Sequence, residues 1–363
     1  MSSYSVAMAA GSARKSALSK RVALAAAAAG GVAGGAILQR RHLHRIASDP
    51  KRALLDNPPR GQPLRVRSAD GTAIHAEIFG PEELPTLVLG HGWTEALRYW
   101  ALVIRELSAE FRIVAYDLRG HGKSAPAAVE DDYSLKRFGE DLEAVLTGAV
   151  PEGQRAVVAG HSLGAMSIAA WAEHHDVGRI RAAALLFTGL GGLVSEQLLV
   201  PVARFAHGLR DPIARRAFFG TRLPLPRFSS PLTYAPLRYI AFGPSASPAL
   251  VAFWERMLAS CATDVRAAVG LALADMELHR ALARLTVPTL VMTGAQDRLT
   301  PPSHARHIAE ELPQLYRVIE LPATGHMGPL ERPAEVADAL RELAGETGPA
   351  DSSPNHADLV QRL

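Results

Sequence analysis

One serine of this chain stands where a hydroxyl group could act as a nucleophile. Ser162 is the centre of the pentapeptide G-H-S-L-G over residues 160–164, between an apolar run at 155–160 and a helix-like stretch at 163–175. A G-x-S-x-G segment is typical of a sharp strand-to-helix turn in which side chains on the flanking positions would clash. Such a turn exposes the serine oxygen at a helix amino terminus, which favours negative charge. Taken alone, the pentapeptide also fits a glycine-rich turn whose serine only caps the helix.

The segments around this turn alternate between short apolar runs and longer helix-like stretches. Buried strands that alternate with helices are typical of a parallel sheet covered on both faces. The alternating stretch at 63–80, with Asp70-Gly71 at its turn, predicts an antiparallel hairpin at the sheet edge. The fold class predicted is therefore α/β, with a mostly parallel sheet of eight strands. Beyond the hairpin, the predicted strands lie within 86–90, 111–117, 155–161, 182–189, 288–294 and 316–321.

The order of predicted strands and helices divides the chain into four parts. Residues 62–189 and 284–345 carry the strands and form the predicted core. Residues 190–283 show helical patches and a proline-rich stretch but no convincing strand, which predicts a helical lid inserted after the sixth strand. Residues 1–61 form an amino-terminal extension, and residues 346–363 read as a mobile tail.

The amino-terminal extension contains an uncharged, Ala- and Gly-rich run at residues 22–38, with basic residues on both sides. Its length is at the lower limit for crossing a bilayer, and alanine and glycine are only weakly apolar. A membrane anchor, a cleaved export signal and a soluble extension all fit this composition. We therefore expect a membrane-associated or exported protein, with a cytoplasmic location as the alternative.

Composition restricts the classes of function. Hydrophobic residues make up 48% of the 363 residues, which suits a large folded core. The net charge of +3 arises largely from the first 67 residues and indicates no nucleic-acid-binding face. Cys261 is the only cysteine, so no cysteine-based zinc or haem motif exists. No organic cofactor or metal is required by the chemistry considered below, and the oligomeric state cannot be predicted.

Five motifs in order give the chain a resemblance to the α/β-hydrolase family over roughly residues 62–345. Besides G-H-S-L-G they are L-G-H-G-W-T (89–94), Y-D-L-R-G-H-G-K-S (116–124), G-A-Q-D-R-L-T-P-P (294–302) and P-A-T-G-H-M-G-P-L-E-R-P (322–333). The resemblance implies a triad in the chain order Ser162, Asp297, His326. In that triad His326 accepts the serine proton and Asp297 orients the imidazole. Asp264 and Asp275, in or beside the predicted lid, are weaker candidates for the acid.

The resemblance also implies where an oxyanion would be stabilised and where a substrate would lie. The backbone N–H groups of Leu163 and Trp93 are the expected donors to the oxyanion. His91 and His121 are expected to hold loops in shape, as are Asp117 and Arg119. Large apolar side chains that could line a lipophilic pocket are Trp93, Phe205, Phe253, Trp254 and Met257.

A serine nucleophile argues against the branches of this family that use aspartate at that position, namely the dehalogenases and epoxide hydrolases. Among serine-bearing branches the sequence is similar to esterases and monoacylglycerol-type lipases, which implies hydrolysis of a small-molecule ester through an acyl-serine intermediate. Cofactor-free perhydrolases or haloperoxidases, thioesterases and acyltransferases share the same motifs and stay open as alternatives. A small-molecule receptor with a dormant triad is the alternative outside catalysis.

Overall fold

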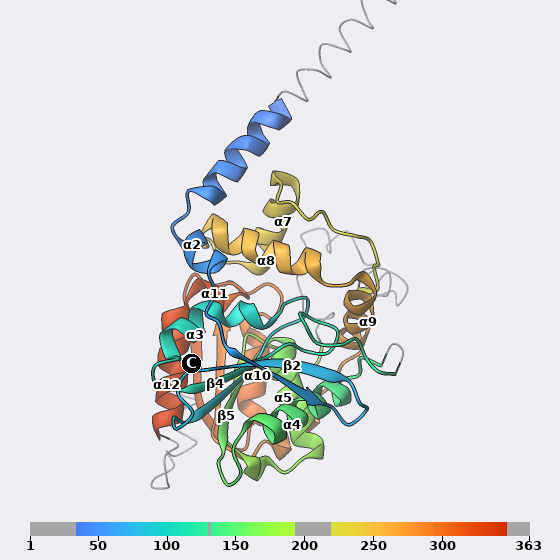
Figure 1. The fold of residues 1–363 in the computed structure, drawn as a ribbon, viewed down its shortest axis with the longest axis vertical. Helices are drawn as coiled ribbons and strands as arrows, with labels where there is room; N and C mark the ends of the chain where they lie inside the picture. Colours follow the sequence, from blue (N-terminus) through green and yellow to red (C-terminus); the bar gives the residue numbers. More distant parts are fainter. Residues whose placement is uncertain (1–33, 130–131, 193–218, 347–363) are drawn as a thin grey trace, which may run out of the picture.

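The eight predicted strands form a single sheet in the computed structural model, which describes residues 34–129, 132–192 and 219–346 (Figure 1). The strand order is β1-β2-β4-β3-β5-β6-β7-β8. β1 pairs with β2 and β2 with β4 in antiparallel fashion, and all other pairs are parallel. The predicted fold class is confirmed. The strands are β1 (Gln62–Arg67), β2 (Ala73–Phe79), β3 (Thr86–Gly90), β4 (Arg112–Tyr116), β5 (Ala156–His161), β6 (Ile180–Leu186), β7 (Thr289–Gly294) and β8 (Leu315–Leu321).

Alternate side chains of the central strands enter two hydrophobic cores, one on each face of the sheet. In β3, for example, Val88 belongs to one core, whereas Leu87 and Leu89 belong to the other. The first core is covered by α4 (Leu135–Ala149), α5 (Leu163–His174) and α10 (Pro302–Glu311). The second is covered by α3 (Ala101–Leu107) and α12 (Pro333–Glu346). Burial on both faces explains why these strands are continuously apolar in sequence.

The segment between β6 and β7 is helical where the structure describes it. It contains α7 (Pro231–Ala241), α8 (Pro248–Ser260) and α9 (Thr263–Ala274), and residues 187–192 and 219–288 include no strand. α7 and α8 lie beyond one edge of the helix-covered sheet (Figure 1). Within the described part of the chain, no helix on its own has the length and apolar character to cross a membrane. α8 and α9 satisfy that test only as a pair, with a bend of 100° between them.

The amino-terminal extension is helical from residue 34 to residue 47 and continues into α2 (Lys51–Asp56). α2 packs against α8. The connection is polar as well, because Asp49 Oδ2 accepts a hydrogen bond from the N–H of Ala249 at 2.9 Å. Most of the predicted anchor or signal at 22–38 lies outside the described residues.

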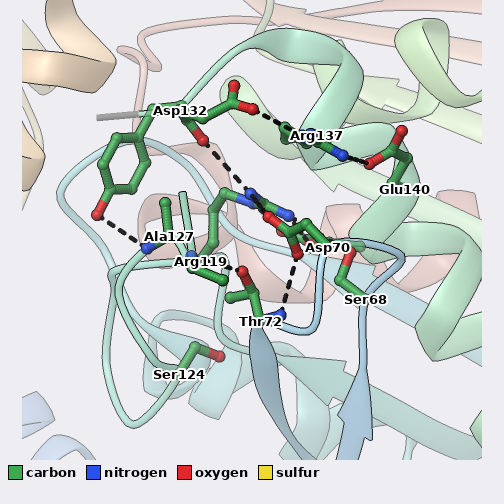
Figure 2. A network of polar contacts seen from close by, with 12 residues as sticks. Ser68, Asp70, Thr72, Arg119, Ser124, Ala127, Asp132, Arg137 and Glu140 are labelled. Carbon is green, nitrogen blue, oxygen red and sulfur yellow. Dashed lines mark hydrogen bonds and ion pairs between the residues drawn. The ribbon is translucent and has the colours of Figure 1, made fainter. Parts of the chain in front are cut away.

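A buried arginine ties the β1–β2 hairpin to α4. The Arg119 guanidinium makes two 2.7 Å hydrogen bonds to the Asp141 carboxylate and a 2.9 Å bond to Asp70 (Figure 2). Burial favours the neutral form of Asp70, but the N–H of Thr72 and the guanidinium outweigh it and hold the pKa of Asp70 at about 2. Removing one member of such a group would leave a buried charge without compensation. Arg119 therefore fixes the loop that follows β4.

Candidate active site

Ser162 occupies a strained turn between β5 and α5. Its backbone has φ 50° and ψ −114°, a region that residues with a side chain rarely adopt. Two hydrogen bonds hold it there: the Ser162 N–H donates to the carbonyl of Leu186 at 2.9 Å, and the Thr188 hydroxyl donates to the carbonyl of Ser162 at 3.0 Å. The neighbouring strand thus maintains the conformation that the turn alone would not keep.

Both glycines of the pentapeptide are required by close backbone contacts. A Cβ atom on Gly160 would lie 2.3 Å from the backbone nitrogen of Ala165, and one on Gly164 would lie 2.3 Å from the carbonyl oxygen of Gly90. Neither contact could be relieved by a side-chain rotation, since the opposing atoms belong to the backbone. This turn over residues 160–164, which we call the elbow, therefore packs directly against the end of β3, where the H-G-W-T segment begins.

Asp297 and His326 form a buried hydrogen-bonded pair. His326 Nδ1 lies 2.8 Å from Asp297 Oδ2. The carboxylate also accepts the N–H groups of Leu299 and Thr300, at 2.8 and 2.9 Å, and the Thr300 hydroxyl at 2.9 Å. A carboxylate can only accept, so the Nδ1 proton lies between the two residues and Nε2 is left free to act as a base. Thr300 is a residue that the motifs did not single out.

The environment sets the protonation of His326. Burial lowers the pKa of the imidazole, but the charge of Asp297 and its hydrogen bond outweigh burial, so that the pKa lies above its ordinary value. Two other histidines near the site differ. Burial lowers the pKa of His91, and burial together with His91 lowers that of His121 to about 3. His121 accepts the N–H of Thr94 at 3.2 Å, and so it holds the H-G-W-T loop as a neutral ring.

Ser162 and His326 line the same cavity, which has a volume of about 440 Å³. No hydrogen bond joins the hydroxyl of Ser162 to the imidazole of His326 among these described atoms. Catalytic hydrogen bonds commonly tighten only when the substrate is bound. The structure thus brings Asp297 and His326 into contact and places Ser162 and His326 on one cavity. Asp264, the rival acid, is instead an exposed partner of Arg222.

The two expected oxyanion donors lie on either side of the elbow. Leu163 is the first residue of α5, so its N–H has no acceptor within the helix. Trp93 lies in the loop that follows β3, and both Gly92 and Trp93 line the cavity. The structure therefore places Trp93 on the cavity wall, whereas Leu163 is fully buried and follows Ser162, which lines the cavity.

A buried carboxylate that sequence motifs did not reveal supports this loop. Glu95 Oε2 accepts the N–H of Gly92 at 2.6 Å and lies 3.1 Å from His161 Nδ1. His161 Nε2 in turn lies 2.9 Å from the carbonyl oxygen of His326. Glu95 and His161 both line the cavity. One chain of hydrogen bonds thus connects the loop before α3, the elbow and the loop that carries His326, which we call the histidine loop.

The same contacts fix a proton between Glu95 and His161. The carbonyl of His326 can only accept, so His161 Nε2 donates. The bond at Nδ1 then needs a second proton, carried either by the ring beside a charged Glu95 or by Glu95 itself. A glutamate three residues after the H-G pair was the only sequence signal for this arrangement, and it has no meaning until the loop is folded.

The histidine loop is also bound to the end of α7. The N–H groups of His326 and Met327 donate to the carbonyl of Ala241 at 2.8 and 3.2 Å. The Glu331 carboxylate accepts the N–H of Gly243 with one oxygen and that of Gly325 with the other, each at 2.9 Å. Three of these hydrogen bonds join the carboxyl-terminal end of α7 to the segment that carries His326, and the bond between Gly325 and Glu331 lies within that segment.

The cavity contains only part of the predicted substrate pocket. Trp93 and Trp254 line it. Phe253 and Met257, four residues apart, share the other face of α8: Phe253 is buried beside Arg98, and Met257 lines a separate cavity. Phe205 lies outside the described residues. The apolar lining that sequence did not predict includes Met166, Phe219, Leu237, Ile240, Leu258 and Leu273.

Comparisons with known proteins agree with this architecture. The chain is 27% identical over 297 residues to the probable oxidoreductase EphD of Mycobacterium tuberculosis, a match that covers 77% of this chain and 49% of that protein. The chain thus spans about half the length of these first relatives. It is 25% identical over 275 residues to the bifunctional esterase/perhydrolase DCH of Acinetobacter calcoaceticus, covering 72% of this chain and 92% of that protein.

A solved structure has the same fold. The esterase RhEst1 from Rhodococcus sp. ECU1013 superposes with a TM-score of 0.60 at 24% identity, covering 79% of this chain and all of that one. The family model described as alpha/beta hydrolase fold matches residues 85–333, which include the elbow, the Asp297–His326 pair and helices α7, α8 and α9. This chain belongs to the alpha/beta hydrolase fold family.

Proposed function

We propose that this protein is a serine hydrolase that cleaves carboxylic esters through an acyl intermediate on Ser162. The observation that carries the proposal is the cavity itself. It joins a serine in a strained elbow to a histidine whose Nδ1 is held by a buried carboxylate, which is the arrangement that turns a weak hydroxyl into a nucleophile. A relative whose name includes an esterase activity supports the same reaction class.

The reaction follows from the positions of these groups. His326 Nε2 removes the proton from Ser162 as its oxygen attacks the ester carbonyl carbon, and the N–H groups of Leu163 and Trp93 receive the resulting oxyanion. His326 then gives the proton to the departing alcohol. A water molecule, deprotonated by the same imidazole, attacks the acyl-serine and releases the acid. Each preorganised oxyanion donor is typically worth about 3 to 4 kcal/mol in the transition state.

The cavity favours a lipophilic ester. Besides the catalytic groups, its wall consists largely of apolar side chains from α5, α7, α8 and α9, among them Met166, Leu237, Ile240 and Leu258. A pocket of this kind binds a hydrocarbon chain by the hydrophobic effect and rejects charged acids. We infer medium-chain or lipid-derived esters as the substrate class. Residues 22–38 would place the enzyme at a membrane, the source of such esters.

Hydrolysis of p-nitrophenyl esters of graded chain length tests the proposal. We expect turnover by the wild-type chain, with a preference for chains longer than acetate, and labelling of Ser162 by a fluorophosphonate. Ser162→Ala should abolish both, and Ser167→Ala is a matched control, because that hydroxyl donates to the carbonyl of Leu163 at 2.8 Å within α5. Absence of turnover and of labelling would refute the proposal. Faster peroxide-dependent acyl transfer than hydrolysis would assign the perhydrolase activity instead.

A further inference from the structure

The exposed large apolar side chains of the described residues are concentrated in two parts of the chain. Eight of the ten lie on two segments: three on the helix over residues 34–47 and five on residues 223–239. Leu232 is 87% exposed, Leu223 73% and Phe228 66%. We name these eight side chains the apolar face. Isolated exposed apolar residues are ordinary, but a cluster of this kind marks a surface that meets something other than water.

The two segments form one surface. Gln39 Nε2 donates to the carbonyl of Ser229 at 2.8 Å, and His42 Nε2 lies 2.8 Å from the hydroxyl of the same serine. The ring of His42 also contacts that of Tyr234 in α7, with 4.8 Å between the ring centroids. In Figure 1 the helix over 34–47 and α7 lie at the same end of the molecule, away from the sheet.

The two segments themselves carry charge of a single sign, and an exposed acid next to them is Asp264, 3.3 Å from Arg222. Residues 34–48 and 219–254 contain six arginines and no aspartate or glutamate, whereas the whole chain has 36 acidic residues among 363. The acidic residues that border these segments are occupied or buried: Asp49 accepts a hydrogen bond from Ala249, and Glu255 is 4% exposed. Guanidinium groups match the geometry of phosphate oxygens. The six arginines are Arg40, Arg41, Arg45, Arg222, Arg227 and Arg238.

The apolar face adjoins the catalytic cavity. Leu237 and Ile240 of α7 line the cavity, whereas Leu232 and Tyr239 of the same helix are exposed. Thr221, two residues before the exposed Leu223, also lines the cavity. One helix therefore has the cavity on one side and the apolar face on the other.

We propose that the apolar face docks on an anionic phospholipid bilayer. The arginines bind the headgroup phosphates, and the apolar side chains enter the boundary between headgroups and acyl chains. Docking places α7 and the cavity behind it against the lipid, so that an ester can pass from the bilayer to Ser162; this last step rests on the proposed ester hydrolysis. The observations favour lipid over a second copy of the chain, because two copies of a predominantly basic face would repel each other.

Tryptophan fluorescence of the full chain tests the contact directly, whatever residues 22–38 do. Phe228→Trp adds an exposed indole to the apolar face, and the wild-type spectrum supplies the background of the four native tryptophans. Val129→Trp is the matched control, because Val129 is 51% exposed and lies outside the apolar face. With vesicles of phosphatidylcholine and brominated phosphatidylglycerol, the emission from position 228 should shift to shorter wavelength and be quenched, and that from position 129 should not.

Two further measurements complete the test. Adding Leu232→Glu to Phe228→Trp, or replacing the anionic lipid by brominated phosphatidylcholine, should remove most of the quenching. Unquenched emission at position 228, or equal quenching at position 129, would overturn docking. So would a blue shift without lipid that accompanies a doubling of mass in sedimentation equilibrium, which would assign the face to self-association.

Hydrolysis of dissolved p-nitrophenyl butyrate by the same variants separates the proposals: an active enzyme without quenching refutes docking alone, and a quenched but inactive one refutes ester hydrolysis alone.

Discussion

Glu95→Gln is the substitution that most directly tests how the H-G-W-T loop, which carries the proposed oxyanion donor Trp93, is held; we call it the oxyanion loop. In the wild-type protein one oxygen of Glu95 serves both the N–H of Gly92 and the ring of His161. A glutamine has nearly the same shape, but the atom at that position is either an amide oxygen or an amide nitrogen. Neither can satisfy both neighbours, since a neutral His161 presents a bare Nδ1 once Nε2 donates to the carbonyl of His326. One buried hydrogen bond is therefore lost.

The size of the effect follows from the bond that is lost. Hydrogen bonds to charged groups contribute about 1.5 to 3 kcal/mol, so the free energy of unfolding should fall by about that amount. A displaced loop also moves the N–H of Trp93. Complete loss of one oxyanion donor lowers kcat by about 10² to 10³. Because Glu95→Gln displaces the donor without removing it, we expect kcat to fall by about 10- to 100-fold, with KM nearly unchanged.

The assay combines steady-state kinetics on p-nitrophenyl butyrate with urea unfolding followed by circular dichroism. Glu110→Gln is a suitable control, because its ion pair with Arg341 is exposed and such pairs contribute at most about 1 kcal/mol. A Glu95→Gln enzyme that kept both the wild-type kcat and the wild-type unfolding free energy would refute the reasoning. A rise in KM alone would show that Glu95 acts on substrate binding and not on the oxyanion loop.

Three other substitutions test separate parts of the site. Asp297→Asn removes the charge that raises the pKa of His326 but leaves the burial that lowers it, so the NMR titration of the imidazole should shift to lower pH and kcat should fall by about 10⁴. In the wild-type protein the pair stabilises the fold fully below about pH 6.5, and this contribution is lost as pH rises through the raised pKa; a pH-independent difference in unfolding free energy between the two proteins would contradict this. Gly164→Ala should cost at least about 1 to 3 kcal/mol of stability in urea unfolding, because its Cβ would meet backbone of β3, whereas Gly345→Ala, with open space around it, should not. Leu237→Trp should fill the cavity and lower kcat/KM for long-chain esters by at least about tenfold relative to acetate; an unchanged chain-length profile would show that the chain lies elsewhere.

Sequence predicted the sheet well because its strands are buried on both faces. The central strands β3, β5 and β7 are buried at every position, and burial on both faces is the physical cause of their apolar sequences. The hairpin was predictable for a local reason, since Asp70-Gly71 supplies the turn, with Gly71 at φ 88°. Ser162 was equally easy to predict, because the elbow is a single short segment in which close backbone contacts require glycine at both flanking positions.

Residues that act through contacts between distant loops could not be found in this way. Glu95 matters because folding brings it to His161, 66 residues further along the chain, and Thr300 because it also lies 3.2 Å from His326 Nδ1. Amphipathic helices posed another difficulty. The apolar residues of α8 occupy two faces, and the sequence does not tell which face meets the cavity; Trp254 does, whereas Phe253 packs on the opposite side.

The bonds from Ala241 and Glu331 to the histidine loop limit how the cavity can open. If α7 swung as a rigid rod about its amino-terminal end, it would pull His326 away from Asp297 or break three hydrogen bonds at once. A movement of α7 that keeps these bonds is a pivot about its carboxyl-terminal end, and it separates Ser229 from Gln39 and His42. Substrate access and the alignment of the imidazole are then mechanically independent, and the enzyme can admit a bulky molecule with its proton acceptor already in position.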